Sequence, residues 1–336
     1  MPRSPHDLPR DLARLGFAER LVHLDGVTLN VCEGPNNGPP VVLVPGQTMP
    51  WRSYQRLLPR IAGRTHAFAI DVRGHGRSPH TPGVYSFSRL GADLVEFLRR
   101  VVPEPAVLTG NSSGGVIALW AAAHAPDRVR AVLAEDPPLF SSEWPRMRDE
   151  PFMHGLFRRA ADTLSGPGPR DVSRFFEGFS VPVQGRDRVM DLPRPIAWVL
   201  GGAIRRAQRQ RPGEPVDLAW LPLHLRLFVR GLSEYDPDFS AACADGRMCD
   251  VDHAAMLAAI RCPVVLLHAN WFRHPTLGLV GAMDDHDVAR AREALPSLQV
   301  QRWRSAHVMH IADPRRFAEA LLALCGELQP KGRSVS

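Results

Sequence analysis

Gly110-Asn111-Ser112-Ser113-Gly114 is the most informative stretch of this chain because of what lies on either side of it. The apolar run 106–108 before it is typical of a buried strand, and the alanine-rich run 116–123 after it favours a helix. A chain that passes from strand to helix in five residues turns sharply, and the two glycines remove side chains that would collide there. Because the serine at the centre of such a turn points out of the sheet edge, Ser112 is the candidate nucleophile.

Apolar runs alternate with helical patterns on both sides of this stretch. Asp25-Gly26 separates two short apolar segments, 21–24 and 27–31, and predicts a hairpin. Helical spacing of apolar residues predicts a helix over 90–102. Further buried strands are expected at 41–44, 66–70, 107–108, 129–134, 264–267 and 298–303. The pattern predicts an α/β fold whose mostly parallel, eight-stranded sheet is covered by helices on both faces.

The alternation stops between residues 138 and 258. Proline-rich breaks at 166–169, 193–195 and 212–215 separate apolar patches at 152–157, 175–179 and 218–232 that have helical character. We expect a helical cap at 138–258, inserted after the sixth strand of a core made of 1–137 and 259–336. Such a cap would close over Ser112 and supply much of a substrate pocket. Residues 331–336 are expected to be disordered.

Serine at its ordinary pKa is a poor nucleophile and needs a base, which in this kind of fold is a histidine just after the last strand. His307 follows the strand expected at 298–303 and precedes Asp313-Pro314, which has the character of a helix start. We therefore expect His307 to be the base. His310, three residues further on, is the alternative, and we expect it to be buried or to line the pocket, hydrogen-bonded to the backbone.

The acid that orients the base has two possible locations. Glu135 and Asp136 end the sixth strand, beside the turn that carries Ser112. Since neighbouring strand residues point to opposite faces, only one of them can reach the histidine, and we choose Asp136. Asp284 and Asp285 follow the seventh strand only after a long loop, and a pair of helix-capping residues is the simpler interpretation for them.

An acyl-transfer site also needs N–H donors for the oxyanion. The backbone N–H of Ser113, directly after the nucleophile, is expected to be one donor. The backbone N–H of Gln47, in the loop after the third strand, is expected to be the second, with Gly46 allowing the turn. His75 lies in a glycine-containing loop at the same sheet edge, and we interpret it as structural.

Composition excludes several other classes of protein. The formal net charge is +6, but the arginines are mixed with acids except in the short cluster 205–211, so no nucleic-acid partner is expected. No apolar run approaches the roughly 20 residues of a membrane span, so no membrane partner is expected. The first residues lack the apolar stretch of a secretory signal, which favours a cytoplasmic protein. The five cysteines show no zinc spacing, so no metal site is expected.

From residue 21 onward the chain resembles the α/β-hydrolase superfamily. The matching motifs, in order, are Pro45-Gly46-Gln47, Asp71-x-Arg73-Gly74-His75-Gly76-x-Ser78, Gly110-x-Ser112-x-Gly114 and His307. A closer resemblance is to bacterial lactone hydrolases that open the macrocyclic ester of zearalenone. It rests on 110–115, on Glu135-Asp136-Pro137 with Phe140, on 234–237 and on 307–310. The chain departs from the superfamily at Pro45, where a histidine commonly precedes the oxyanion glycine.

The resemblance implies an α/β-hydrolase fold with an inserted helical cap, and an acid after the sixth strand, at Asp136. It implies a serine hydrolase that opens a small apolar lactone or ester through an acyl-enzyme, without a metal or organic cofactor. Met49, Phe140 and His310 are expected in the pocket, and large apolar cap residues suit such a substrate: Phe140, Trp144, Phe152, Met153, Trp198 and Trp220.

Several alternatives stay open at this point. A general carboxylesterase or a carbon–carbon bond hydrolase would use the same triad, and a non-catalytic small-molecule receptor would use cap closure instead. Epoxide hydrolases and haloalkane dehalogenases are disfavoured because they use an aspartate where Ser112 stands. The oligomeric state, monomer or homodimer, is also open.

Overall fold

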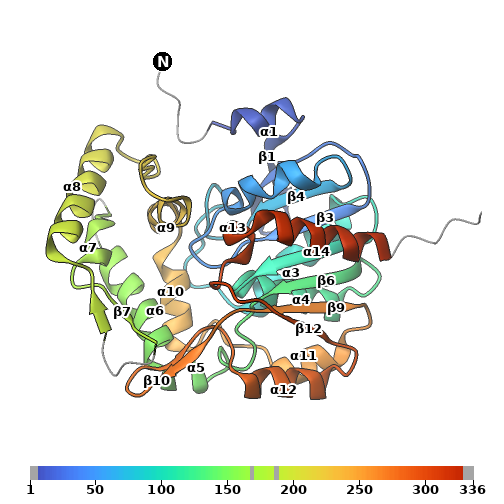
Figure 1. The fold of residues 1–336 in the computed structure, drawn as a ribbon. Helices are drawn as coiled ribbons and strands as arrows, with labels where there is room; N and C mark the ends of the chain where they lie inside the picture. Colours follow the sequence, from blue (N-terminus) through green and yellow to red (C-terminus); the bar gives the residue numbers. More distant parts are fainter. Residues whose placement is uncertain (1–6, 167–169, 185–188, 328–336) are drawn as a thin grey trace, which may run out of the picture.

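The computed structural model describes residues 7–166, 170–184 and 189–327, and the tail for which we expected disorder lies outside these ranges. Its centre is an eight-stranded sheet with the order β1-β2-β4-β3-β5-β6-β9-β12 (Figure 1). The strands are β1 (Ala18–Leu24), β2 (Val27–Glu33), β3 (Pro40–Val44), β4 (His66–Asp71), β5 (Ala106–Asn111), β6 (Val129–Glu135), β9 (Val264–His268) and β12 (Gln299–Arg302).

Only β2 runs against the other strands of this sheet. It pairs antiparallel with β1 on one side and with β4 on the other, whereas β4, β3, β5, β6, β9 and β12 pair parallel. The β1–β2 hairpin turns at Asp25-Gly26, where Gly26 has φ +81°. The predicted eight-stranded, mostly parallel sheet with an initial hairpin is therefore confirmed.

Successive side chains of the strands point to opposite faces of the sheet, and each face has its own hydrophobic core. In β3, Val41 and Leu43 join the core on one face, and Val42 and Val44 join the core on the other. The first core is closed by α1 (Arg10–Arg14), η1 (Trp51–Arg56), α2 (Leu58–Ile61), α13 (Met309–Ala312) and α14 (Pro314–Glu327). The second is closed by α3 (Phe87–Arg100), α4 (Ser113–His124) and α12 (Asp285–Ala294). Burial on both faces explains why these strands are continuous apolar runs.

The chain between β6 and β9 is mainly helical, and we call it the β6–β9 segment. Its helices are α5 (Arg146–Asp149), α6 (Pro151–Leu164), α7 (Ser173–Phe176), α8 (Arg194–Gln210), α9 (Leu223–Glu234), α10 (Pro237–Asp245) and α11 (His253–Ala259). Figure 1 shows α6 to α10 gathered at one side of the sheet, with α7 and α8 farthest out. Helix α11, although most of it falls in the range expected for the cap, packs against α4 and α12.

Two short hairpins complete the fold. Strands β7 (Ser180–Pro182) and β8 (Val189–Asp191) lie between α7 and α8, and β10 (Phe272–His274) and β11 (Gly278–Val280) lie in the loop after β9. The second hairpin fills the long loop that separates β9 from Asp284. Among the helices of the described residues, none combines the length and the hydropathy that a membrane span requires.

Candidate active site

Ser112 sits on a strained turn between β5 and α4. Its φ is +53°, a value that costs energy for a residue with a side chain and persists only where the surroundings enforce it. The neighbouring glycines are required by close backbone approach. A Cβ on Gly110 would lie 2.1 Å from the Gly114 carbonyl oxygen, and one on Gly114 would lie 2.2 Å from that of Val44. The turn therefore fixes Ser112 at the carboxyl edge of the sheet.

His307 lies after β12 and is held by Asp136, the residue that follows β6. The His307 Nδ1 is 2.7 Å from Asp136 Oδ2, and the backbone N–H of Ala269 donates to the other carboxylate oxygen at 3.1 Å. Burial lowers the pKa of His307, but the hydrogen bond and charge of Asp136, aided by Glu135, outweigh it and raise that pKa above its ordinary value. A histidine whose pKa is raised in this way can accept a proton, and the carboxylate of Asp136 stabilises the resulting imidazolium.

Ser112 and His307 face the same space, since both line two adjoining cavities. Within the described residues the Ser112 hydroxyl makes no hydrogen bond to the imidazole. Bonds of this kind are often long or absent without substrate and tighten in the bound complex.

The expected oxyanion donors lie on the loop after β3 and at the start of α4. The loop is pressed against the nucleophile turn, because a Cβ on Gly46 would lie 3.1 Å from Ser112 Cβ. Neither Gln47 N–H nor Ser113 N–H donates to an acceptor among the described residues. Both N–H groups are therefore available for a developing oxyanion.

Buried polar contacts hold the oxyanion loop in place. The Thr48 N–H donates to His75 Nε2 at 3.1 Å, and the Gln47 side-chain amide donates to Ser240 Oγ of α10 at 2.5 Å. Burial lowers the pKa of His75 to about 4, so the ring stays neutral and can accept this bond. His75 thus acts on the site by positioning the loop, as the sequence interpretation expected of a structural residue.

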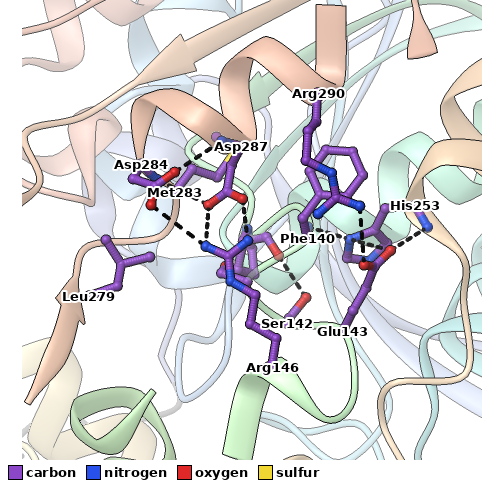
Figure 2. Close-up of polar contacts among 12 residues, drawn as sticks. Phe140, Ser142, Glu143, Arg146, His253, Leu279, Met283, Asp284, Asp287 and Arg290 are labelled. Carbon is purple, nitrogen blue, oxygen red and sulfur yellow. Dashed lines mark hydrogen bonds and ion pairs between the residues drawn. The ribbon is translucent and has the colours of Figure 1, made fainter. Parts of the chain in front are cut away.

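Asp284 and Asp285, the alternative acids, lie at the start of α12. Asp284 caps the helix: its carboxylate accepts from Asp287 N–H at 3.0 Å, and Asp287 accepts in return from Asp284 N–H at 3.1 Å. Figure 2 shows Arg146 bridging this pair of carboxylates. Asp285 is exposed and pairs with Arg302. Asp284 therefore caps helix α12, as the sequence analysis interpreted it, and Asp285 lies in the first turn of the same helix.

Phe140 is fully buried and does not border either cavity beside Ser112. Its N–H donates to His253 Nδ1 at 2.7 Å, and the Arg290 guanidinium lies 3.9 Å from the centre of its ring (Figure 2). Its positive φ of +63° turns the chain away from the sheet edge. Phe140 therefore supports the entry into the β6–β9 segment, in contrast to the pocket position that we expected.

His310 is also remote from both cavities. It is fully buried, and Glu135 accepts both its backbone N–H, at 2.9 Å, and its ring Nδ1 proton, at 2.7 Å. Its ring stacks on Tyr54 with centroids 4.2 Å apart. Glu135 and Asp136 thus bind two different histidines three residues apart. The Glu135–His310 pair anchors the backbone that carries His307.

The third residue expected in the pocket, Met49, packs with Leu227 and Ile311 instead. Besides Ser112, His307, Gln47, Phe152 and Met153, the cavities are lined by residues that the sequence analysis did not single out. One cavity, of about 160 Å³, is lined by Gln47, Thr48, Ser112, Met153, Leu156, Phe157, Ala160, Phe175, Phe228, Leu232, Ser240 and His307. The other, of about 380 Å³, is lined by Ser112, Pro138, Phe152, Met153, Leu156, Gln184, Asn270, Phe272, Val280, Gly281, Ala282 and His307.

Two sequence signals point to part of this lining. The helical spacing around Phe152 and Phe157 brings Met153, Leu156 and Phe157 of α6 together, and the glycines at 278 and 281 allow the β10–β11 hairpin to bend toward Ser112. Trp198 and Trp220, cap residues that we expected to suit an apolar substrate, face outward, at 76% and 61% exposed.

Asp284, His286 and Asp287 lie close enough together to hold a metal ion. Their carboxylates, however, already bind the guanidinium groups of Arg146 and Arg273. These arginines supply the positive charge that a cation would bring, so the cluster fits an ion-pair network that fastens α12 to α5 and the β10–β11 hairpin.

Comparison with known proteins agrees with the fold described above. A model of the alpha/beta hydrolase fold matches residues 39–190. The structure is similar to that of carboxylesterase CesB from Bacillus subtilis, with a TM-score of 0.62 and 16% identity over 94% of this chain and 95% of that one.

Two curated relatives match part of the chain. One is 2-(acetamidomethylene)succinate hydrolase from Mesorhizobium japonicum, 33% identical over 130 residues, which are 39% of this chain and 46% of the relative. The other is epoxide hydrolase A from Mycobacterium tuberculosis, 39% identical over 123 residues, which are 34% of this chain and 37% of the relative. The chain thus matches less than half the length of either relative.

Proposed function

We propose that this chain, which has the α/β-hydrolase fold, is a serine hydrolase of that superfamily and cleaves a carboxylic ester. The observation that carries the proposal is the shared position of Ser112 and His307 on two adjoining apolar cavities, with Asp136 bonded to the far nitrogen of the imidazole. Nucleophile, base and orienting acid come from three separate strand ends and meet at one sheet edge.

In the proposed reaction His307 takes the Ser112 proton while Oγ attacks the ester carbonyl carbon. The carbonyl oxygen becomes an oxyanion bound by the N–H groups of Gln47 and Ser113. Collapse of this intermediate breaks the carbon–oxygen bond, and the imidazolium gives its proton to the departing alkoxide. A water molecule, activated by His307, then hydrolyses the acyl-enzyme and frees Ser112 and the acid.

Cavity chemistry supports an apolar substrate. In the part of the chain that the structure describes, no Asp, Glu, Arg or Lys lines either cavity. A binding site for a dicarboxylate, such as the name of the Mesorhizobium relative implies for that protein, would need cationic partners. Epoxide opening of the kind named for the mycobacterial relative is disfavoured because Ser112 replaces the aspartate nucleophile of epoxide hydrolases.

We propose, more specifically, that the substrate is a macrocyclic lactone of the zearalenone type. Two cavities that share Ser112, Met153, Leu156 and His307 suit an ester with bulky apolar groups on both sides of its carbonyl. In a lactone the alkoxide that departs stays tethered to the acyl-enzyme, so a single hydroxy acid is released. In this proposal α6, α7, α9 and α10 of the β6–β9 segment act as the cap.

Turnover of zearalenone beside a series of p-nitrophenyl esters, followed by chromatography, tests both levels of the proposal. Ring opening by the native chain and none by Ser112→Ala is the expected result. Ester cleavage without ring opening would leave a carboxylesterase and remove the lactone. No Ser112-dependent turnover of any ester would contradict the function itself and favour a carbon–carbon bond hydrolase or a receptor.

Covalent labelling by a fluorophosphonate tests the base independently of the substrate. We expect His307→Ala to lose labelling of Ser112, because among the described residues no other basic side chain lines either cavity. His310→Ala is the matched control and should retain labelling, since its ring faces Glu135 and Tyr54. The reverse pattern would assign the base to His310.

A further inference from the structure

The β6–β9 segment carries an apolar surface that the active site does not use. Of the large hydrophobic side chains exposed in the described ranges, most lie between residues 181 and 225: Val181, Val189, Met190, Ile196, Trp198, Val199, Trp220 and Leu225. Exposed apolar residues scattered singly need no explanation, whereas a cluster of this kind marks an interaction site. We call these eight residues the outer apolar face.

The outer apolar face surrounds a groove between the β7–β8 hairpin, α8 and the start of α9. The groove has a volume of about 580 Å³, and Asp191 is the one charged residue among those that line it. Its walls are Phe176, Phe179, Leu192, Leu200 and Leu221, together with members of the outer apolar face. Figure 1 shows α8 on the outside of the molecule, away from the sheet, where it is accessible to a large partner.

The charge on α8 indicates which partner fits. The helix contains no acidic residue, and after Arg194 at its start its exposed side chains change along its length from apolar to basic. Trp198 and Val199 lie in its first half, and Arg206 and Arg209 lie on the same exposed side in its second half. Arg206 and Arg209 make no ion pair within the described part of the chain. Tryptophans beside unpaired arginines are typical of helices that lie in the headgroup region of an anionic membrane.

We propose that the outer apolar face docks on the surface of an anionic lipid bilayer, with Trp198 and Trp220 inserted among the headgroups and Arg206 and Arg209 against lipid phosphates. A second copy of the chain is a poorer occupant. A symmetric contact through this face would bring together two α8 helices whose basic residues find no acid on the partner helix. The association is peripheral, because no described helix can span a bilayer. It departs from the sequence expectation of no membrane partner, which considered only spanning segments.

Sedimentation with vesicles tests the proposal on the whole chain. Vesicles of phosphatidylcholine mixed with phosphatidylglycerol are compared with vesicles of phosphatidylcholine alone. We expect binding to the mixed vesicles that weakens as salt is raised. Trp198→Ala with Trp220→Ala should reduce the partition coefficient on the order of tenfold or more, since both side chains are largely exposed and their loss leaves the core intact.

Pairs of variants with the same substitution, one on the outer apolar face and one elsewhere, test whether the location of the residue matters. Val199→Ser should weaken binding, whereas Val84→Ser, at 47% exposure against 52% but far from the face, should not. Arg209 and Arg292 each lie in the last turn of a helix, α8 and α12 respectively. Arg209→Glu should reduce binding on the order of tenfold, and Arg292→Glu should leave it unchanged.

Three outcomes would overturn the proposal. One is no binding of the native chain to mixed vesicles at low salt. The second is equal losses in the face variants and in their matched controls. The third is a native dimer that becomes a monomer in Trp198→Ala with Trp220→Ala and binds no vesicles, which would assign the face to a second copy. The variants of the outer apolar face should hydrolyse a water-soluble ester as fast as the native chain does. A failure of the membrane proposal can therefore be told apart from a failure of the proposed function.

Discussion

Glu135 and Asp136 are adjacent in the chain, yet each carboxylate binds a different histidine. Asp136 leaves β6 with φ +45° and reaches His307 at the cavity, while Glu135 is still in the strand and binds His310 in the interior. The two pairs lie in different surroundings, because His307 borders the cavities and His310 is fully buried. A one-residue difference in position therefore separates the acid proposed to orient the base from the acid that binds His310.

Asp136→Asn should lower kcat by about 10⁴-fold while leaving the fold intact, because an amide no longer stabilises the imidazolium or fixes the tautomer of His307. The same change should move the acid limb of the pH profile of kcat/KM to lower pH. Asp136 is what raises the pKa of His307 against burial, so without it the base stays deprotonated further into acid. Steady-state kinetics across pH, with circular dichroism as a check on folding, measure both effects.

Asp285→Asn is the control for that experiment. Asp285 is exposed at the start of α12 and pairs with Arg302, so near-normal kinetics are expected. If instead Asp285→Asn abolished turnover and Asp136→Asn did not, the acid would have to be reassigned to the loop after β9.

At the scale of elements, the oxyanion loop is held between the core and the β6–β9 segment. Gly231 of α9 lies so close to it that a Cβ there would be 1.5 Å from the Thr48 carbonyl oxygen. The Gln47 side chain bonds Ser240 of α10, and Asp236 N–H donates to the Gly74 carbonyl at 2.7 Å. Movement of α9 or α10 therefore moves the residues expected to hold the oxyanion.

Gly231→Ala should displace the Thr48 backbone and lower kcat on the order of 10²-fold or more, which is the loss expected for one misplaced oxyanion donor. Gly202→Ala on α8 is the matched control, since a Cβ there meets nothing within 4 Å. That change should leave kcat unaltered and raise the free energy of unfolding by about 0.5–1 kcal/mol through helix propensity. Equal kcat for the two variants would show that α9 does not position the loop.

At the scale of the whole molecule, neutral histidines buried in the fold make stability depend on pH. Burial lowers the pKa of both His75 and His253 to about 4. In the unfolded chain a histidine titrates near pH 6.5, so between about pH 6.5 and pH 4 the unfolded state binds the proton and the folded state does not. The free energy of unfolding is therefore expected to fall as pH drops through this window.

His253→Asn should flatten that dependence by up to about 3 kcal/mol across the window, because one buried titrating group is removed. Asparagine keeps an acceptor for the Phe140 N–H, although lost packing lowers stability at every pH. His224→Asn, on an exposed position of α9, should leave the slope as in the native chain. Urea unfolding at several pH values gives the slopes, and identical slopes in all three proteins would exclude His253 as a source.

The strands and the first hairpin could be predicted from the pattern of neighbouring residues in the sequence. Continuous apolar runs predicted the parallel strands because both faces of each strand are buried, and Asp25-Gly26 predicted the hairpin because its turn needs a positive φ. The pocket was not readable in this way. Phe140, Met49 and His310 differ little from cavity residues in type, and only the three-dimensional packing separates them from Met153, Leu156 and Phe272.

The sequence by itself determined the sheet, the turn that carries Ser112 and the order of the chemical groups along the chain, because periodicity and glycine placement act over a few residues. Tertiary structure decided the rest. It selected which of two adjacent carboxylates meets His307, brought the β10–β11 hairpin into the cavity wall, and turned Trp198 and Trp220 outward. These outcomes depend on contacts between segments distant in the chain, where burial and steric fit, and not local propensity, set the lowest free energy.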